Sequence, residues 1–213
     1  MSTKSWRESK ARIGAEPLLQ ISQKNIVLIG FMAVGKSAVG QKLAQSLKRP
    51  FVDLDQAIAD REGVKVKEIF ARKGEAYFRK LEKETMKEVL SRDGQVVATG
   101  GGAVMDTENL RLLKQRSVLI SLTATPETLL QRSGSGNQRP LLKEGDRLGR
   151  IGELLTQRKR VYRQAHFTID TDKLSVDEVV VRIIKEVQHN TSGRAESRSQ
   201  NSEAGRKMGD SER

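Results

Sequence analysis

The chain has 213 residues, which is enough for one α/β domain with a hydrophobic core of its own, flanked at most by short tails. It contains no cysteine, so it has neither a disulfide framework nor a thiolate nucleophile or thiolate metal site. Its net charge of +12 suits nucleic acid or a small anionic substrate, but its few aromatic residues do not alternate with the basic ones. We therefore expect small anionic substrates and no nucleic-acid partner.

The first 24 residues mix basic and acidic side chains and have no apolar core region, which excludes a secretory signal. No stretch approaches the length of a membrane span. We expect residues 1–24 to be a flexible extension of a cytoplasmic, monomeric protein without a membrane partner. A short organellar transit peptide is the weaker alternative, because Glu8 and Glu16 fit one poorly.

Residues 26–37 join a short apolar run to a phosphate-binding loop. Ile26–Ile29 is long enough for a buried strand, GFMAVGKS fills the GxxxxGKS pattern, and helical apolar spacing follows. Backbone N–H groups of such a loop point at phosphate, its lysine reaches the outer phosphates, and its serine holds Mg²⁺. The residues expected to hold phosphate are Gly30, Ala33, Val34, Gly35, Lys36, Ser37 and Ala38. A glycine-rich turn that contains Lys-Ser by chance is the alternative.

The next apolar run, Phe51–Leu54, predicts a second strand with two carboxylates at its end. Side chains alternate along a strand, so we expect Asp53 and Asp55 on one face, at the edge where the phosphate loop opens. Asp53 is then expected near the metal, and Asp55 is expected to accept a proton from a substrate hydroxyl group. An Asp55 that merely caps a helix starting at Gln56 is the alternative of equal weight.

Two further segments supply an arginine and three glycines. Arg79 and Glu82 lie three residues apart on a helix that opens at Gly74, so Glu82 is expected to hold Arg79 toward an anionic substrate. An ordinary exposed ion pair is the default alternative. The run Gln95–Thr99 predicts a buried strand, and the three glycines Gly100–Gly102 let a ligand lie against the backbone amides.

Residues 132–142 form a Gly/Ser-rich segment with an arginine toward each end. It predicts a mobile lid at about residues 133–148 that carries Arg139 over the phosphates, with an ordinary surface loop as the alternative. Beyond it, Arg158, Arg160 and Arg163 lie on a predicted helix whose charge could simply be solvated.

The whole pattern between the tails alternates strands with helices, and further strands are expected at 118–122 and 167–170. Five such strands imply right-handed crossovers and an α/β fold with a five-stranded parallel sheet, helices on both faces, and ligands at the carboxyl ends of the strands. The last helix has one apolar stripe, made of Val176, Val179, Val180, Ile183, Ile184 and Val187. Residues 25–190 thus form one expected domain, and residues 191–213 a disordered tail.

Taken together, these motifs resemble the shikimate kinase family. The matching segments are GFMAVGKS, FVDLDQAI, IFARKGEAYFRKLE, VVATGGGAV, RSGSGNQRPLL and RKRVYRQA, in family order within residues 25–187. The resemblance implies a single P-loop kinase domain similar to nucleoside monophosphate kinases. It also implies ATP-dependent, Mg²⁺-assisted phosphorylation of the 3-hydroxyl group of shikimate, on the chorismate route to aromatic amino acids.

The resemblance further implies a role for each site residue. Lys36 and Ser37 are the phosphate and Mg²⁺ residues, and Asp53 is the carboxylate behind the metal. The shikimate contacts it implies are Asp55, Arg79, Gly101 and Arg158, while Arg139 is the lid arginine and Arg132 flanks adenine. Lys36, Asp55 and Arg139 are then the catalytic residues.

Two positions depart from the family pattern. Ala33 stands where glycine is usual, and if this position needs a positive φ the alanine costs about 1–2 kcal/mol. Ala38 stands where threonine is usual, which removes one hydroxyl contact to phosphate, a loss of about 1 kcal/mol. Both departures are expected to weaken ATP binding without abolishing it.

Other functions are open at this point. A kinase for another small polyol, such as gluconate, would share the fold. A P-loop protein that binds nucleotide without turnover should have lost Asp55 or Arg139, and both are present. A basic nucleic-acid-binding protein would lose affinity steeply with salt.

Overall fold

The structure is a computed structural model that describes residues 23–134 and 146–188. The predicted extension before residue 23, residues 135–145 of the predicted lid with Arg139, and the predicted tail lie outside the described residues. The chain divides into two units, of which Gln23–Arg182 carries the sheet. The other unit consists of Met1–Ser22 and Ile183–Arg213, and its described part is the end of the last helix, residues 183–188.

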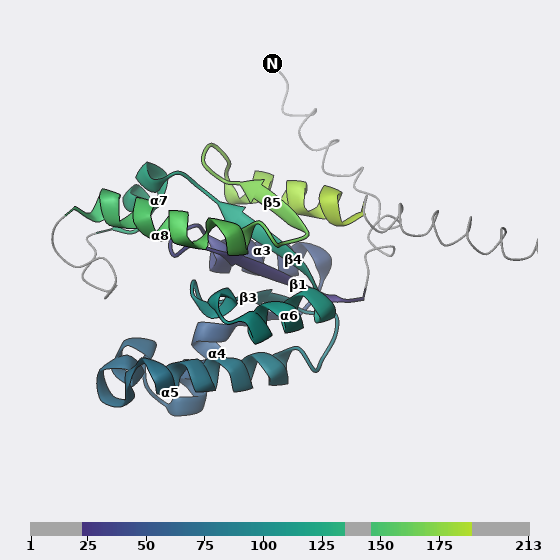
Figure 1. The fold of residues 1–213 in the computed structure, drawn as a ribbon. Coiled ribbons are helices and arrows are strands. Elements are labelled where there is room, and N and C mark those ends of the chain that lie inside the picture. The colour runs from purple at the N-terminus through teal and green to yellow at the C-terminus, as the bar shows by residue number, and fades with distance from the viewer. Residues whose placement is uncertain (1–22, 135–145, 189–213) are drawn as a thin grey trace, which may run out of the picture. The chain divides into compact units, whose positions relative to one another are not determined.

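Five parallel strands form one sheet in the order β2-β3-β1-β4-β5 (Figure 1). They are β1 Asn25–Gly30, β2 Phe51–Asp53, β3 Val96–Ala98, β4 Ser117–Thr123 and β5 Phe167–Asp170, which confirms all five predicted strands. The central strand β1 is buried throughout because it pairs on both sides, Val27 standing opposite Val97 and Leu119. A strand buried on both faces needs the continuous apolar run that the sequence shows.

Helices follow the strands and cover both faces of the sheet. They are α3 Lys36–Leu47, α4 Leu54–Glu62, α5 Val66–Val89, α6 Thr107–Arg116, α7 Pro126–Arg132 and α8 Arg147–Tyr162, with a short 3₁₀ helix, η1, at Ala103–Met105. Figure 1 shows α3 behind the sheet and α6 and α8 in front of it. None of the helices among the described residues combines the length and apolarity needed to cross a membrane.

The last helix spans residues 176–188. Val179 and Val180 are buried, as predicted, but Val176 is 40% exposed, so the predicted apolar stripe extends one turn too far. Periodicity shows which side chains share a helix face. How many turns of that face are buried depends on the elements that pack against the helix.

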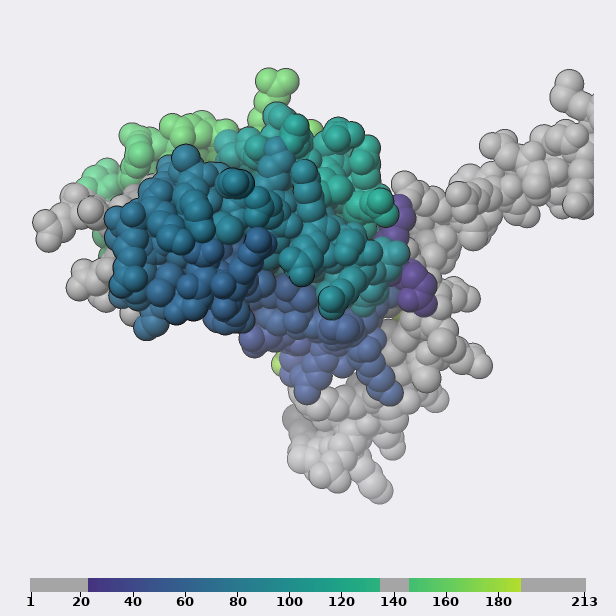
Figure 2. All heavy atoms as spheres, turned by 90° about the horizontal axis from the view of Figure 1, so that it is seen from below, coloured from purple at the N-terminus to yellow at the C-terminus, as the bar shows by residue number. Residues whose placement is uncertain are grey.

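Helices α4 and α5 form a pair with its own small core. Ile58 of α4 packs against Ile69, Phe78 and Leu81 of α5. Figure 2 shows the pair as a continuous blue layer on one face of the molecule. The backbone of α5 leaves helical geometry at Gly74 (φ 77°, ψ 173°), which agrees with the prediction that a helix opens there. This kink lets the two halves of α5 run in different directions beside α4.

Candidate active site

A cavity of about 740 Å³ opens at the carboxyl ends of β1, β2 and β3, the edge that a parallel sheet uses for ligands. Its walls come from the loop after β1, the starts of α3 and α4, the helix α5, the glycine loop after β3, and α8. Ten of the predicted site residues line it, namely Ala33, Gly35, Lys36, Ser37, Ala38, Asp53, Asp55, Arg79, Gly101 and Arg158. The volume suits one or two small molecules.

The loop after β1 wraps around the side chain of Lys36. The Lys36 ammonium group donates hydrogen bonds to the carbonyl oxygens of Gly30 and Phe31, each at 3.0 Å, and only 9% of the residue is exposed. Among the described residues no side chain caps the start of α3, so its first N–H groups are available to an anion. Gly30, the last residue of β1, and Val34, within the loop, were expected to touch phosphate, but both are buried and do not line the cavity.

Ala33 adopts a left-handed backbone conformation, with φ at 63°. Position 33 therefore does need a positive φ, as the sequence analysis considered. An L-residue with a Cβ is strained in this conformation by about 1–2 kcal/mol. The strain lies in the phosphate loop itself.

Replacing Ala33 with glycine is expected to raise the free energy of unfolding by about 0.5–1 kcal/mol, since glycine relieves the strain but gains entropy when unfolded. The melting temperature should then rise by about 1–4 °C in a calorimetric scan. Ala38→Gly is the matched control: Ala38 lies in the helix α3, where the same change should lower stability by about 0.5–1 kcal/mol. A lower melting temperature for Ala33→Gly would mean that the loop is not strained.

Ser37 and Asp53 meet beside the phosphate loop. The Ser37 hydroxyl donates to Asp53 Oδ2 at 2.5 Å. A hydroxyl and a carboxylate oxygen fit Mg²⁺, which binds few protein ligands and takes the rest from water and substrate phosphates. The described residues hold no cluster of three or more His, Cys, Asp or Glu side chains with metal-binding geometry. Ser37 and Asp53 are the residues that could hold this ion.

Asp53 also caps the helix that follows it. Its Oδ1 accepts hydrogen bonds from the N–H groups of Asp55 at 3.1 Å and Gln56 at 3.4 Å. The alternative in which Asp55 caps a helix at Gln56 is therefore wrong: α4 begins at Leu54, which also shortens the predicted strand. Asp53 has the extended backbone that a cap residue needs. Strand alternation was the wrong reason to place the two carboxylates together, yet both line the cavity.

Asp55 lies in the first turn of α4 with its carboxylate toward the cavity wall. Burial raises the pKa of this carboxyl group, and the charge of Asp53 raises it further. Lys36 and Arg79 act in the opposite direction without cancelling the shift. A raised pKa brings a carboxylate closer to the range in which it takes up a proton, which suits a general base.

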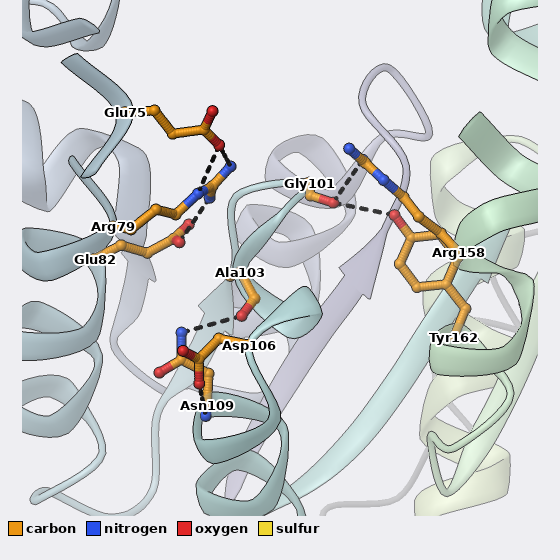
Figure 3. A network of polar contacts seen from close by, with 9 residues as sticks. All are labelled: Glu75, Arg79, Glu82, Gly101, Ala103, Asp106, Asn109, Arg158 and Tyr162. Carbon is orange, nitrogen blue, oxygen red and sulfur yellow. Dashed lines mark hydrogen bonds and ion pairs between the residues drawn. The ribbon is translucent and has the colours of Figure 1, made fainter. Parts of the chain in front are cut away.

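Arg79 is held between two carboxylates of its own helix (Figure 3). Its Nη1 donates to Glu82 at 2.7 Å, while Nε and Nη2 donate to Glu75 Oε1 at 3.2 and 3.1 Å. Glu82 is only 1% exposed, so this is not the ordinary exposed ion pair of the default alternative. Burial raises the pKa of Glu82 despite the opposing charge of Arg79, and Glu82 Oε1 has no hydrogen-bond partner among the described residues.

The glycine loop after β3 makes room for these side chains. A Cβ at Gly100 would lie 2.7 Å from Asp55 Oδ1 and 3.0 Å from Glu82 Oε1. A Cβ at Gly102 would lie 2.7 Å from Arg79 Nη2. Two of the three glycines are therefore needed so that the charged groups of α4 and α5 can approach the loop.

The third glycine connects the loop to α8. The carbonyl oxygen of Gly101 accepts hydrogen bonds from Arg158 Nη1 at 2.9 Å and from the Tyr162 hydroxyl at 3.1 Å. The Arg158 guanidinium also lies over the ring of Phe31, 5.4 Å from its centre. Tyr162 was not predicted, because the sequence showed it only as one residue inside a basic helix.

One predicted site arginine, Arg132, and two further arginines of the α8 segment lie away from the cavity. Arg132 donates to the hydroxyl and carbonyl oxygens of Thr171, at 2.9 and 2.7 Å, and does not line the cavity. Arg160 and Arg163 are exposed at the end of α8, as the solvated alternative expected. Arg139 lies outside the described residues, and its role stays a prediction.

Sequence reasoning also missed an apolar wall of the cavity, formed by Val66, Phe70 and Phe78 of α5. The rings of Phe70 and Phe78 have their centres 4.5 Å apart. In a straight helix residues eight positions apart are separated by about 12 Å along the axis, so this contact depends on the kink at Gly74. Helical periodicity alone could not reveal it.

Comparison with known proteins gives a consistent result. The family model for shikimate kinase matches residues 32–188. A curated shikimate kinase of Pelotomaculum thermopropionicum is 46% identical over 161 residues, which cover 76% of this chain and 94% of the relative. A curated shikimate kinase of Thermus thermophilus is 41% identical over 170 residues, covering 79% of this chain and 92% of the relative.

Solved structures agree. A shikimate kinase from Acinetobacter baumannii in complex with shikimate superimposes with a TM-score of 0.77 at 35% identity, covering 82% of this chain and 98% of that one. A shikimate kinase from Aquifex aeolicus gives a TM-score of 0.70 at 38% identity, covering 78% of this chain and 97% of that one.

Proposed function

Because the chain belongs to the shikimate kinase family, it is an enzyme that phosphorylates shikimate with ATP, and we propose that the phosphoryl group is transferred to the 3-hydroxyl group. The observation that carries the proposal is a cavity in which a phosphate loop faces two arginines and a carboxylate of raised pKa. ATP and a small hydroxy acid need these two kinds of surface side by side.

The substrate half of the cavity suits a ring that carries one carboxylate and several hydroxyl groups. Arg79 and Arg158 supply planar cationic donors for the carboxylate, and Asp55 supplies acceptors for hydroxyl groups. The wall of Val66, Phe70 and Phe78 provides an apolar surface for the carbon ring. A gluconate-like open chain would use this flat wall less well.

The nucleotide half follows from the loop residues. The N–H groups at the start of α3 and the Lys36 ammonium group are proposed to bind the phosphates of ATP, and Ser37 and Asp53 to hold Mg²⁺. A bound Mg²⁺ would neutralise phosphate charge as it develops during transfer. Arg132 is proposed to flank adenine and Arg139 to act over the phosphates, on the family resemblance described above.

In the proposed reaction Asp55 holds the proton of the attacking hydroxyl group while Lys36 stabilises the negative charge on the transferring phosphoryl group. We propose that the protein acts as a monomer, as the sequence analysis expected. We place the reaction in the cytoplasm, in agreement with the sequence analysis.

The test is a coupled assay that measures the rate of ADP release with and without shikimate. We expect ADP release to depend on shikimate and the product to carry its phosphate on the 3-oxygen, as phosphorus–proton correlation NMR would show. Shikimate methyl ester lacks the carboxylate that Arg79 and Arg158 are proposed to bind, and should lose at least about thirtyfold in kcat/KM. Equal turnover of acid and ester would refute the arginine assignment, and phosphate on another oxygen would refute the proposed position of transfer.

A further inference from the structure

The carbonyl group of Gly101 is fixed from one side by two residues of α8 (Figure 3). Arg158 Nη1 lies 2.9 Å and the Tyr162 hydroxyl 3.1 Å from the same oxygen. Arg158 lines the cavity, whereas Tyr162 is 5% exposed and lies behind it. Within the described part of the chain, Tyr162 therefore reaches the site through Gly101 and Arg158.

We propose that Tyr162 is a positioning residue for shikimate: its hydroxyl group fixes the peptide between Gly101 and Gly102 and, with it, the guanidinium group of Arg158. The inference rests on the proposed function, in which Gly101 and Arg158 contact shikimate. Tyr162 itself touches no substrate in this arrangement.

The peptide that follows Gly101 is one that needs an external restraint. It joins two glycines, and without a Cβ on either side such a peptide rotates more easily than one between other residues. A peptide group is planar, so its carbonyl oxygen and the N–H of Gly102 point in opposite directions. When two donors of α8 hold the oxygen, the Gly102 N–H is fixed on the side away from α8.

The glycine loop is also fixed at its far end, at Ala103, by a residue that is not part of α8. The carbonyl oxygen of Ala103 accepts a hydrogen bond at 3.1 Å from Asn109 Nδ2, a buried side chain of α6 (Figure 3). The carbonyl oxygens of Gly100 and Gly102 also accept backbone hydrogen bonds, from the N–H groups of Ala103 at 3.3 Å and Met105 at 3.0 Å, so the Gly101 carbonyl is the one among the three glycines that α8 restrains. The Tyr162 hydroxyl, with Arg158, restrains this carbonyl group.

The same hydroxyl group orders Arg158. Residues 158 and 162 are four apart on α8 and share a face. An arginine side chain loses much rotamer freedom when it is fixed. Arg158 bonds to the same Gly101 oxygen as Tyr162 and lies over the ring of Phe31, so its guanidinium group is already held before substrate arrives. Burial raises the pKa of Tyr162, although Arg158 opposes the shift, so the hydroxyl stays protonated and remains a donor.

The experiment compares three variants with the wild-type enzyme. Tyr162→Phe removes the hydroxyl and keeps the ring. Tyr77→Phe is the matched control, since the Tyr77 hydroxyl bonds to Lys73 and Glu62 on the α4–α5 pair and the residue does not line the cavity. Arg158→Ala tests the site on which the inference depends. The measurements are the dissociation constants of shikimate and ATP, the kinetic constants, and the melting temperature.

We expect Tyr162→Phe to weaken shikimate binding about three- to tenfold and to change ATP binding less than twofold. Tyr77→Phe should change neither constant, even if both variants melt at lower temperature. Loss of shikimate affinity in Arg158→Ala but not in Tyr162→Phe would overturn the inference and keep the proposed site. Equal weakening of shikimate and ATP binding in Tyr162→Phe would also overturn it, because that is what a general structural role produces. Unchanged shikimate binding in both Tyr162→Phe and Arg158→Ala would overturn the inference together with the proposed site.

Discussion

Turnover is expected to fall at least about a thousandfold when Lys36 is replaced by methionine, while the fold stays intact. The ammonium group is the buried cation of the phosphate loop, and preorganised charge aimed at a transferring phosphoryl group contributes several kcal/mol to catalysis. Methionine keeps most of the aliphatic stem, so the loop loses the charge and two hydrogen bonds but little packing. Turnover and melting temperature should be measured on the same preparation.

Lys42→Met on the same helix is the control for Lys36→Met. Lys42 is exposed and forms an ion pair at 3.0 Å with Asp177 away from the cavity, so its loss should leave turnover within about twofold of wild type. Turnover in Lys36→Met within tenfold of wild type, with the melting temperature unchanged, would rule out a phosphate-binding role for this lysine.

Asp55→Asn is expected to lower turnover at least about a hundredfold and to change the dissociation constant of ATP, measured without shikimate, less than threefold. Asparagine keeps the shape of the side chain but cannot accept the proton. Asp60→Asn is the control, because Asp60 is an exposed residue of α4 that bonds to Gln56 outside the cavity. If ATP affinity collapsed while shikimate affinity held, Asp55 would belong to the nucleotide half of the site.

Because the pKa of Asp55 is raised, Asp55→Asn should also differ from wild type in how turnover and stability depend on pH. Turnover of the wild type should fall as the pH drops through that pKa, because the protonated acid accepts no proton. The free energy of unfolding depends on pH in the opposite direction from turnover. A folded pKa above the unfolded one contributes stability at low pH that is lost as the pH rises. When the pH is above its folded pKa, the ionised, half-buried Asp55 thus destabilises the fold, and Asp55→Asn should melt at a higher temperature than wild type, with the difference shrinking as the pH falls through the folded pKa toward the unfolded one.

The sequence predicts those parts of the fold that depend on local pattern. Ile26–Ile29 and GFMAVGKS indicated the central strand and the loop, because a strand buried on both faces and a phosphate loop each need a contiguous run of particular residues. The other strands were found in the same way. Arg79 and Glu82 were paired correctly from helical spacing, although their burial could not be read from it.

The features that sequence reasoning missed depend on tertiary geometry. The Phe70–Phe78 contact requires the kink at Gly74, and the cap on α4 went to Asp53 because the backbone is still extended there. Tyr162 reaches Gly101 across 61 positions of the chain. Such a contact leaves no local mark in the sequence, since it depends on where α8 packs beside the glycine loop.

Arg79 already has its charge matched before any substrate arrives, by one carboxylate that is buried and one that is not. Glu82 is fixed, but Glu75 is 68% exposed and held by a single oxygen. If Arg79 binds a carboxylate ligand as proposed, the ligand would exchange with Glu75 as one counter-ion for another, and Glu75 would return to water. The exchange leaves the number of ion pairs unchanged, so this arginine selects for the shape and charge of its ligand more than it adds to affinity.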